Sequence, residues 1–177
     1  YNNLGFLYKY QKKIDYAIKA FRNACKINSG FAEAKTNLSY SLLLQGNYEE
    51  GWKENEQRFL QEKSTFPHAN PSLEKWTAHK PNQGDKLLIV SEQGFGDTVQ
   101  FMRYVIYLQT KGVDISFCAQ EKLHSLIKSS TTNLPIISPK ETDLIKQGKW
   151  LPLLSLPKFL GVCPENPIVN QPYLFPN

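Results

Sequence analysis

The sequence predicts a chain of two parts, a set of α-helical hairpins followed by an α/β domain built on a parallel sheet. The first part, residues 1–62, contains no proline and carries apolar residues at helical spacing. From residue 86 to residue 177, short apolar runs alternate with helical stretches, which is typical of βαβ units. Between the two, residues 63–85 carry three prolines and no helical period, which indicates a linker that we expect Phe66 and Trp76 to pin to a surface.

The helical part contains an internal repeat of 34 residues, in which Asn3-Leu4 recurs as Asn37-Leu38. Residues of the types found in tetratricopeptide repeats stand at seven expected positions of the first unit: Tyr1, Leu4, Gly5, Tyr8, Ala17, Phe21 and Ala24. Residues 1–62 therefore resemble the last repeats of a tetratricopeptide protein. The small residues would let paired helices approach closely, and the large ones would fill the space between them.

The second unit of the repeat spans residues 31–59 and turns through Gly46-Asn47. Its second helix departs from the repeat pattern at Gly51, Asn55 and Arg58. Terminal repeats are often atypical because they face something other than another repeat, so we expect this helix to face the next domain.

The elements expected in the α/β part follow from its apolar runs and glycines. Strands are expected at 86–91, 113–119 and 134–138, and helices at 98–112 and 120–130. Residues 152–157 suggest a strand that runs into a short helix, and the proline-rich residues 164–177 should be extended. Because the pattern starts and stops in mid-course, we expect the chain to be a fragment.

Composition narrows the classes of function. The net charge of +5 is spread over 177 residues without a basic block, which argues against nucleic acid as the main partner. Three distant cysteines without CxxC spacing indicate free thiols in a reducing compartment. With no signal peptide and no apolar run of about 18 residues, a cytoplasmic location without a membrane span is expected.

The stretch SEQGFGDTVQFMRY, residues 91–104, follows the first predicted strand. A dinucleotide fingerprint is disfavoured because Val99 stands where its third glycine belongs, and a P-loop lacks its G-K-[ST]. The plainest interpretation is structural: Gly94 and Gly96 allow a sharp turn, and the Asp97 carboxylate caps the following helix.

The position of this loop favours a functional interpretation beside the structural one. Open α/β sheets bind their ligands at the carboxyl ends of the strands, where this loop lies. More polar residues gather here than a turn needs: Glu92, Gln93, Asp97, Thr98, Gln100 and Arg103.

The motifs EQGFGDTVQFMRY, LPLLSLPKFLG and a terminal PYL, after a degenerate repeat, resemble bacterial tetratricopeptide proteins fused to a heptosyltransferase-like glycosyltransferase. The resemblance covers nearly the whole chain. It implies that residues 86–177 are the acceptor-side, Rossmann-like domain of a GT-B enzyme, which transfers a sugar from a nucleotide-sugar donor to a glycan or protein acceptor. The donor site would lie in a second domain outside this chain, so the chain alone is expected to be inactive.

The resemblance also implies roles for individual residues. Asp97 would be the catalytic base that deprotonates the acceptor hydroxyl, with Glu92 as second choice. Capping competes with this role, because a capping carboxylate has a lowered pKa and is a poorer base. Substrate-binding roles are implied for the neighbouring positions Gln93, Gly94, Gly96, Thr98, Gln100 and Arg103, although Gln100 and Arg103 could equally be solvated.

Asn3 and Asn37 occupy one position of two repeats and resemble the asparagines with which the repeats of O-GlcNAc transferases bind peptide backbone. The alternative is that they are ordinary exposed helical asparagines.

Neither metal nor cofactor is expected, since D-x-D is absent and His68, His79 and His124 lack ligand spacing. The competing function is a non-catalytic protein-interaction module built on the repeats; a nucleotide-linked oxidoreductase is disfavoured by Val99.

Overall fold

The computed structural model describes residues 1–60, 67–92, 94–131, 133–168 and 171–175. The chain divides into two compact units. Residues Tyr1–Thr65 and Gly161–Asn166 form a helical unit, and residues Phe66–Leu160 and Pro167–Asn177 form a sheet unit. Together they give the expected combination of helical hairpins and a parallel α/β sheet.

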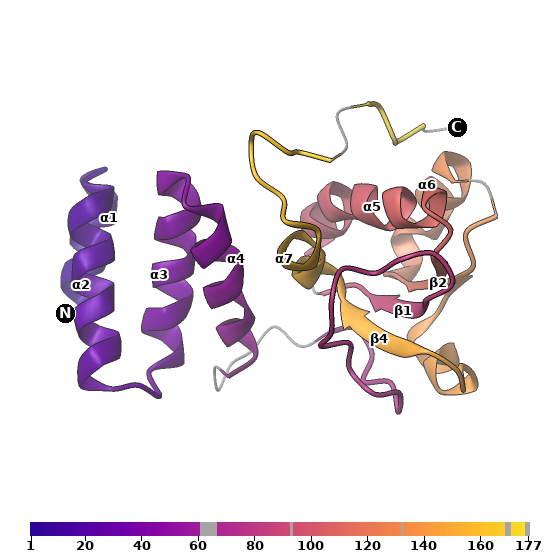
Figure 1. Ribbon diagram of the computed structural model, residues 1–177, viewed down its shortest axis with the longest axis horizontal. Helices are drawn as coiled ribbons and strands as arrows, with labels where there is room; N and C mark the ends of the chain where they lie inside the picture. The colour runs from indigo at the N-terminus through magenta and orange to yellow at the C-terminus, as the bar shows by residue number, and fades with distance from the viewer. Residues whose placement is uncertain (61–66, 93, 132, 169–170, 176–177) are drawn as a thin grey trace. The chain divides into compact units, whose positions relative to one another are not determined.

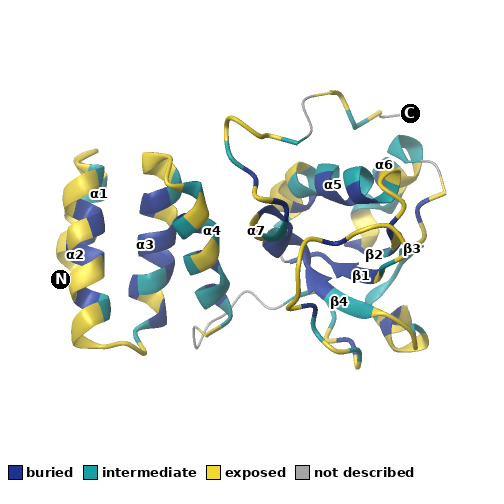
Figure 2. Cartoon of the chain, viewed as in Figure 1, coloured by how far each residue is buried: buried dark blue, intermediate teal, exposed yellow. Residues whose placement is uncertain are grey.

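The helical unit consists of two hairpins and a short 3-10 helix, Glu56–Leu60. The hairpins are formed by α1 (Asn2–Tyr10), α2 (Ile14–Ile27), α3 (Ala32–Gln45) and α4 (Tyr48–Asn55). Each helix packs against the next one along the chain, as Figure 1 shows. Helix α3 packs between α2 and α4 and has a correspondingly long buried stripe (Figure 2).

The core of the helical unit is centred on Phe21, which is fully buried beside Ala17, Leu38 and Leu42. A Cβ placed on Gly5 would lie 2.5 Å from the Phe21 ring, so only glycine permits this approach of α1 to α2. The prediction that Gly5 lets the paired helices come close is therefore confirmed.

The sheet unit is built on four parallel strands in the order β3-β2-β1-β4. The strands are β1 (Lys86–Val90), β2 (Asp114–Cys118), β3 (Ile136–Ile137) and β4 (Lys149–Pro152). At the central strand, Val90 pairs in register with Cys118 on one side and Pro152 on the other. The carboxyl ends of β1, β2 and β4 therefore lie at one edge of the sheet.

The helices of the sheet unit are α5 (Phe95–Thr110), α6 (His124–Ser130) and α7 (Leu156–Leu160). Helix α5 packs against β2 and α7 (Figure 1). Ala69, Leu73 and Trp150 pack against a cluster formed by Leu88 and Val90 of β1 and Cys118 of β2.

Two elements of the sheet unit begin three residues earlier than the sequence predicts. The strand expected from residue 152 lies earlier, at Lys149–Pro152, because Leu87 through Val90 pair with Lys149 through Pro152 and a 3-10 turn follows at once. Helix α5 starts at Phe95 instead of residue 98, because the chain turns into helix immediately after Gly94.

The described part of the segment expected to be a linker, residues 67–85, belongs to the sheet unit. The backbone N–H of Trp76 donates to the Trp150 carbonyl at 2.8 Å, and the N–H of Trp150 donates to the Glu74 carbonyl at 3.0 Å. The Trp76 side chain is buried and donates to the His79 carbonyl. Trp76 thus pins this segment as predicted, whereas Phe66 lies outside the described residues.

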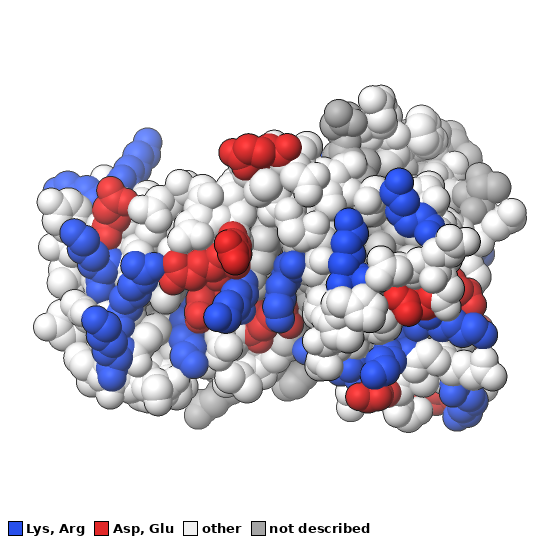
Figure 3. Space-filling view, viewed as in Figure 1, with Lys and Arg blue, Asp and Glu red and all other residues white. Residues whose placement is uncertain are grey.

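Charges of both signs occur on each unit in the face shown in Figure 3. Among the described residues, no helix has both the length and the apolar character that crossing a bilayer requires.

Candidate functional site

A cluster of buried polar residues occupies the carboxyl edge of the sheet. Its members follow the three strands that end there or begin α5, and none is more than 6% exposed: Ser91, Glu92, Thr98, Gln120 and Ser155. Buried polar side chains are costly unless they are hydrogen-bonded or serve a function. Apart from Thr142, the buried polar residues of the described sheet unit therefore gather at the edge that the sequence singled out.

Glu92 ties the strand ends together. Its carbonyl accepts a hydrogen bond of 2.7 Å from Nε2 of Gln120, which follows β2. Its carboxylate accepts one of 3.3 Å from the backbone N–H of Leu154, which follows β4. With only 3% of the residue exposed, the Glu92 carboxylate points into the protein and holds its architecture.

Two polar atoms of this cluster lack a hydrogen-bond partner within the described chain, Oγ of Ser91 and Oε1 of Gln120. Both are inaccessible to solvent in this structure. Such atoms are uncommon in folded proteins because each forfeits the hydrogen bonds it made to water. Among the described residues, the buried side-chain polar atoms without a hydrogen-bond partner thus lie just after the ends of β1 and β2.

Asp97 lies in the first turn of α5 and is exposed. The prediction that Asp97 is the N-terminal cap is wrong: Gly94 is the N-cap, and it makes no side-chain capping hydrogen bond. Because the helix begins at Phe95, Asp97 is its third residue. An acid there is still stabilised by the helix dipole, yet its carboxylate remains open to a ligand.

The two glycines of the loop have different surroundings. Gly94 has an extended conformation, φ −77° and ψ 121°, and Gly96 is not among the residues with positive φ, so neither needs the left-handed freedom of glycine. A Cβ on Gly94 would overlap the Asp97 carboxylate, whereas a Cβ on Gly96 would meet nothing within 4 Å. At the start of the helix, the backbone of Gly96 is therefore accessible to a ligand.

The other predicted substrate-binding residues do not gather at one point. The Thr98 hydroxyl is buried and donates to the Gly94 carbonyl at 3.0 Å, which commits it to the helix start. Gln100 is exposed, and Gln93 lies outside the described residues. Arg103 donates from Nε to the Gln100 carbonyl at 2.8 Å and from Nη2 to the Tyr173 hydroxyl at 2.9 Å.

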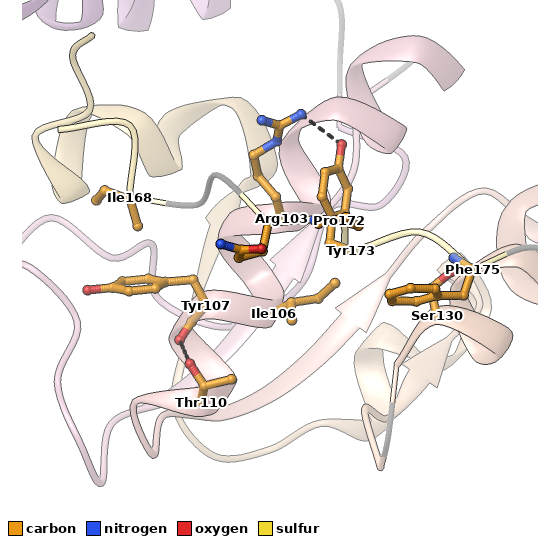
Figure 4. Close-up of a pocket in the computed structure, with 10 residues that line it drawn as sticks. Arg103, Ile106, Tyr107, Thr110, Ser130, Ile168, Pro172, Tyr173 and Phe175 are labelled. Carbon is orange, nitrogen blue, oxygen red and sulfur yellow. Dashed lines mark hydrogen bonds between the residues drawn. The ribbon is translucent and has the colours of Figure 1, made fainter. Parts of the chain in front are cut away.

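Arg103 belongs to a separate pocket of about 300 Å³ that the sequence did not predict. Its walls come from α5, from the end of α6, from Ile168 and from residues 171–175, here called the C-terminal segment (Figure 4). The single sequence signal was the tyrosine of the terminal PYL motif, because Tyr173 is the residue that joins this segment to α5.

The two asparagines at equivalent repeat positions, Asn3 and Asn37, have different surroundings. Asn37 is buried, and its Nδ2 donates to Oδ1 of Asn2 at 3.2 Å. Asn2 in turn donates to the Glu33 carboxylate at 3.1 Å, while Asn3 is exposed. Of the two asparagines expected to bind a peptide, Asn3 is thus exposed, whereas Asn37 is buried and bonded to Asn2.

The titratable groups form no metal site among the described residues, where no group of three or more His, Cys, Asp or Glu side chains comes together. Burial raises the pKa of the Cys118 thiol from 9.0 to about 12, and the charge of Glu141 adds to the increase. Cys25, Cys118 and Cys163 are all free thiols.

Comparison with known proteins leaves this geometry as the main guide to function. No family model matches the sequence. No curated protein matches it significantly, and neither does any solved structure.

Proposed function

We propose that the sheet unit is the acceptor-side domain of a glycosyltransferase, with its site at the start of α5 and Asp97 as the general base. The observation that carries the proposal is the exposed Asp97 carboxylate in the first turn of a helix that begins at the carboxyl edge of a parallel sheet. Ligands of open α/β sheets bind at this edge.

In the proposed reaction, the Asp97 carboxylate takes the proton of an acceptor hydroxyl. The acceptor oxygen attacks the anomeric carbon of the donor sugar, and the bond from that carbon to the nucleoside diphosphate breaks. One C–O bond forms, one breaks, and the leaving diphosphate carries away the electron pair. The donor, a nucleotide sugar, would be held by protein outside the residues described here.

Between the two candidate carboxylates, the geometry favours Asp97. The Glu92 carboxylate is buried and accepts the Leu154 N–H, so an acceptor hydroxyl cannot reach it without opening the strand ends. Asp97 is exposed beside the empty space over Gly96, where an acceptor can approach the backbone. Glu92 is then a positioning residue that fixes the loop leading to Asp97.

The experiment that tests this proposal is the Asp97→Asn substitution in the full-length polypeptide, assayed for sugar transfer from a panel of nucleotide sugars. Loss of a general base is expected to lower the transfer rate about 10²- to 10⁴-fold. Asparagine preserves the shape of the side chain, so the thermal stability should hardly change. Transfer that persists at the wild-type rate would remove Asp97 from the mechanism.

A second candidate function, binding of a protein partner by the helical unit, is favoured by exposed apolar side chains at repeat spacing. Phe6 and Tyr40 are 43% and 46% exposed, and Tyr10 and Leu44 are 94% and 64% exposed. Each pair is separated by 34 residues. A Tyr10→Ser, Leu44→Ser double variant should lose partner binding with little loss of stability, since both side chains are mostly exposed.

The two functions are compatible, because each would be carried out by a different unit of the chain. The helical unit would select the partner or acceptor protein, and the sheet unit would bind the acceptor group. The three free thiols are consistent with a reducing, cytoplasmic setting. If partner binding were the entire function, Asp97→Asn would leave every activity of the polypeptide unchanged.

A further inference from the structure

The pocket that contains Arg103 lies on the side of α5 that the C-terminal segment crosses. Its floor is formed by Arg103, Ile106 and Thr110, which share one face of α5 because they are spaced three and four residues apart. Figure 4 shows Pro172, Tyr173 and Phe175 along its other side.

Hydrogen bonds hold this C-terminal wall in place at two points. The Tyr173 hydroxyl donates to the Val99 carbonyl at 3.0 Å and accepts from Arg103 at 2.9 Å. Further along, the backbone N–H of Phe175 donates to the Ser130 hydroxyl at 2.9 Å. The pocket therefore exists in the folded unit before any ligand binds, which lowers the entropic cost of binding.

The lining combines apolar surface with positive charge. Arg103 is the one charged residue among the described lining residues, and no acid is among them. Outside the lining, the ammonium groups of Lys80 and Lys111 lie 5.8 and 5.5 Å from the centre of the Tyr107 ring. The surroundings of the pocket thus favour an anion over a neutral or cationic group.

Arg103 retains hydrogen-bonding capacity for such an anion. A guanidinium carries five N–H donors in a planar fork. The bonds to Gln100 and Tyr173 use Nε and Nη2, and the group stacks at 4.6 Å from the centre of the Tyr173 ring. A carboxylate matches the geometry of the remaining donors.

The size and the walls of the pocket indicate the rest of the ligand. Its volume of about 300 Å³ is roughly twice that of a cavity that accommodates benzene, about 150 Å³. Tyr107, Tyr173 and Phe175 offer aromatic surface, and Ile106 and Pro172 offer aliphatic surface. A flat molecule of one or two rings fills such a space and stacks or packs edge-on against these rings.

We propose that this pocket binds a small aromatic carboxylate, with the ring system between α5 and the C-terminal segment and the carboxylate on Arg103. The site is distinct from the start of α5, and it does not depend on the proposed sugar transfer. Arg103 then serves this second ligand instead of the acceptor sugar.

The test is an NMR titration of the folded 177-residue chain with 2-naphthoate and, separately, with the uncharged 2-naphthamide. We expect 2-naphthoate to shift the amide signals of Ile106, Tyr107 and Ser130 and to leave that of Gly96 in place. The amide should bind at least about tenfold more weakly, because a charge-assisted hydrogen bond to Arg103 is lost. Equal affinities of the two probes would overturn the proposal.

Two variants separate the charge from the cavity. Arg103→Gln should lower the 2-naphthoate affinity about tenfold or more and remove the preference over the amide. Because Arg103 also holds Tyr173, an Ile106→Trp variant, which fills the pocket and keeps Arg103, should abolish binding of both probes. Arg22→Gln in the helical unit is the matched control and should change neither affinity. Absence of binding by the unmodified chain up to about 1 mM, or shifts that map elsewhere, would also refute the site.

Discussion

The carboxylate of Asp97 lies against the α-carbon of Gly94, so that a methyl group on residue 94 would overlap its oxygen Oδ2. Gly94→Ala should therefore push the Asp97 side chain out of its place and destabilise the fold by about 1 kcal/mol. In an Asp97→Ala background the same change should cost less. Chemical denaturation of the four proteins of this double-mutant cycle measures the coupling, and a coupling near zero would contradict the contact.

Gly96→Ala is the companion prediction, because a Cβ there meets no atom within 4 Å. Alanine favours the helix over glycine, so we expect stability to stay unchanged or to rise by up to about 1 kcal/mol. If a ligand uses the open backbone at Gly96, the added methyl group should nevertheless weaken acceptor binding. Unchanged acceptor affinity in a stable Gly96→Ala variant would place the ligand elsewhere.

Substitution of Glu92 should mainly lower the stability of the protein, whereas substitution of Asp97 should mainly lower its activity. Glu92→Ala leaves the Leu154 N–H without its carboxylate at a buried position, and we expect it to cost about 1–3 kcal/mol of unfolding free energy. Asp97→Ala loses only a favourable interaction with the helix dipole, about 0.3–1 kcal/mol. Urea denaturation of both variants checks the order, and a larger loss for Asp97→Ala would reverse the assigned roles.

Cys118 should resist alkylation in the native protein. Burial raises the pKa of its thiol from 9.0 to about 12, so at pH 8 the thiolate that reacts is scarcely populated. Mass spectrometry after iodoacetamide treatment should find Cys163, which is half-buried, modified well before Cys118. Modification of Cys118 at the rate of Cys163 would contradict its burial.

The same raised pKa makes stability depend on alkaline pH. Above about pH 9, the unfolded chain releases the Cys118 proton while the folded chain retains it up to about pH 12. The stabilisation from this group is thus complete below pH 9 and is lost as the pH rises. Cys118→Ala should make the decline of unfolding free energy between pH 9 and the pH of alkaline unfolding less steep.

Lys12 occupies the turn between α1 and α2 with φ 59°, in the left-handed region that disfavours side chains. Its side chain is exposed, so Lys12→Gly removes strain and little else. We expect the free energy of unfolding, measured by thermal denaturation, to rise by about 0.5–1 kcal/mol. The matched control is Lys19→Gly on the exposed face of α2, which should lose about 1 kcal/mol because the residue is helical.

The fold was largely predictable because its signals are local. A proline-free helical period and alternating apolar runs depend on neighbouring residues, and both hairpins and the parallel sheet followed from them. Strand β4 was displaced by three residues because its position is set by pairing with Leu87 through Val90. That pairing joins segments about 60 residues apart, which no local pattern records.

The sequence predicted where the candidate site lies, but not the surroundings of its side chains. The sequence located polar residues at the carboxyl edge of the sheet, but three side chains of similar character have different surroundings. Glu92 is buried, Asp97 is exposed, and Arg103 faces another pocket. These differences depend on where Leu154 and Tyr173 arrive in the fold. Such long-range contacts are what sequence periodicity does not contain.

The helical unit includes Gly161–Asn166, and the indole N–H of Trp52 donates at 2.8 Å to the Val162 carbonyl, 110 residues later. This has a consequence for synthesis on the ribosome. At about 5–20 residues per second, the carbonyl that Trp52 binds is translated roughly 5–22 s after the indole. The hydrogen bond from Trp52 can therefore form only after strands β1 to β4 have been synthesised, although α4 is made before them.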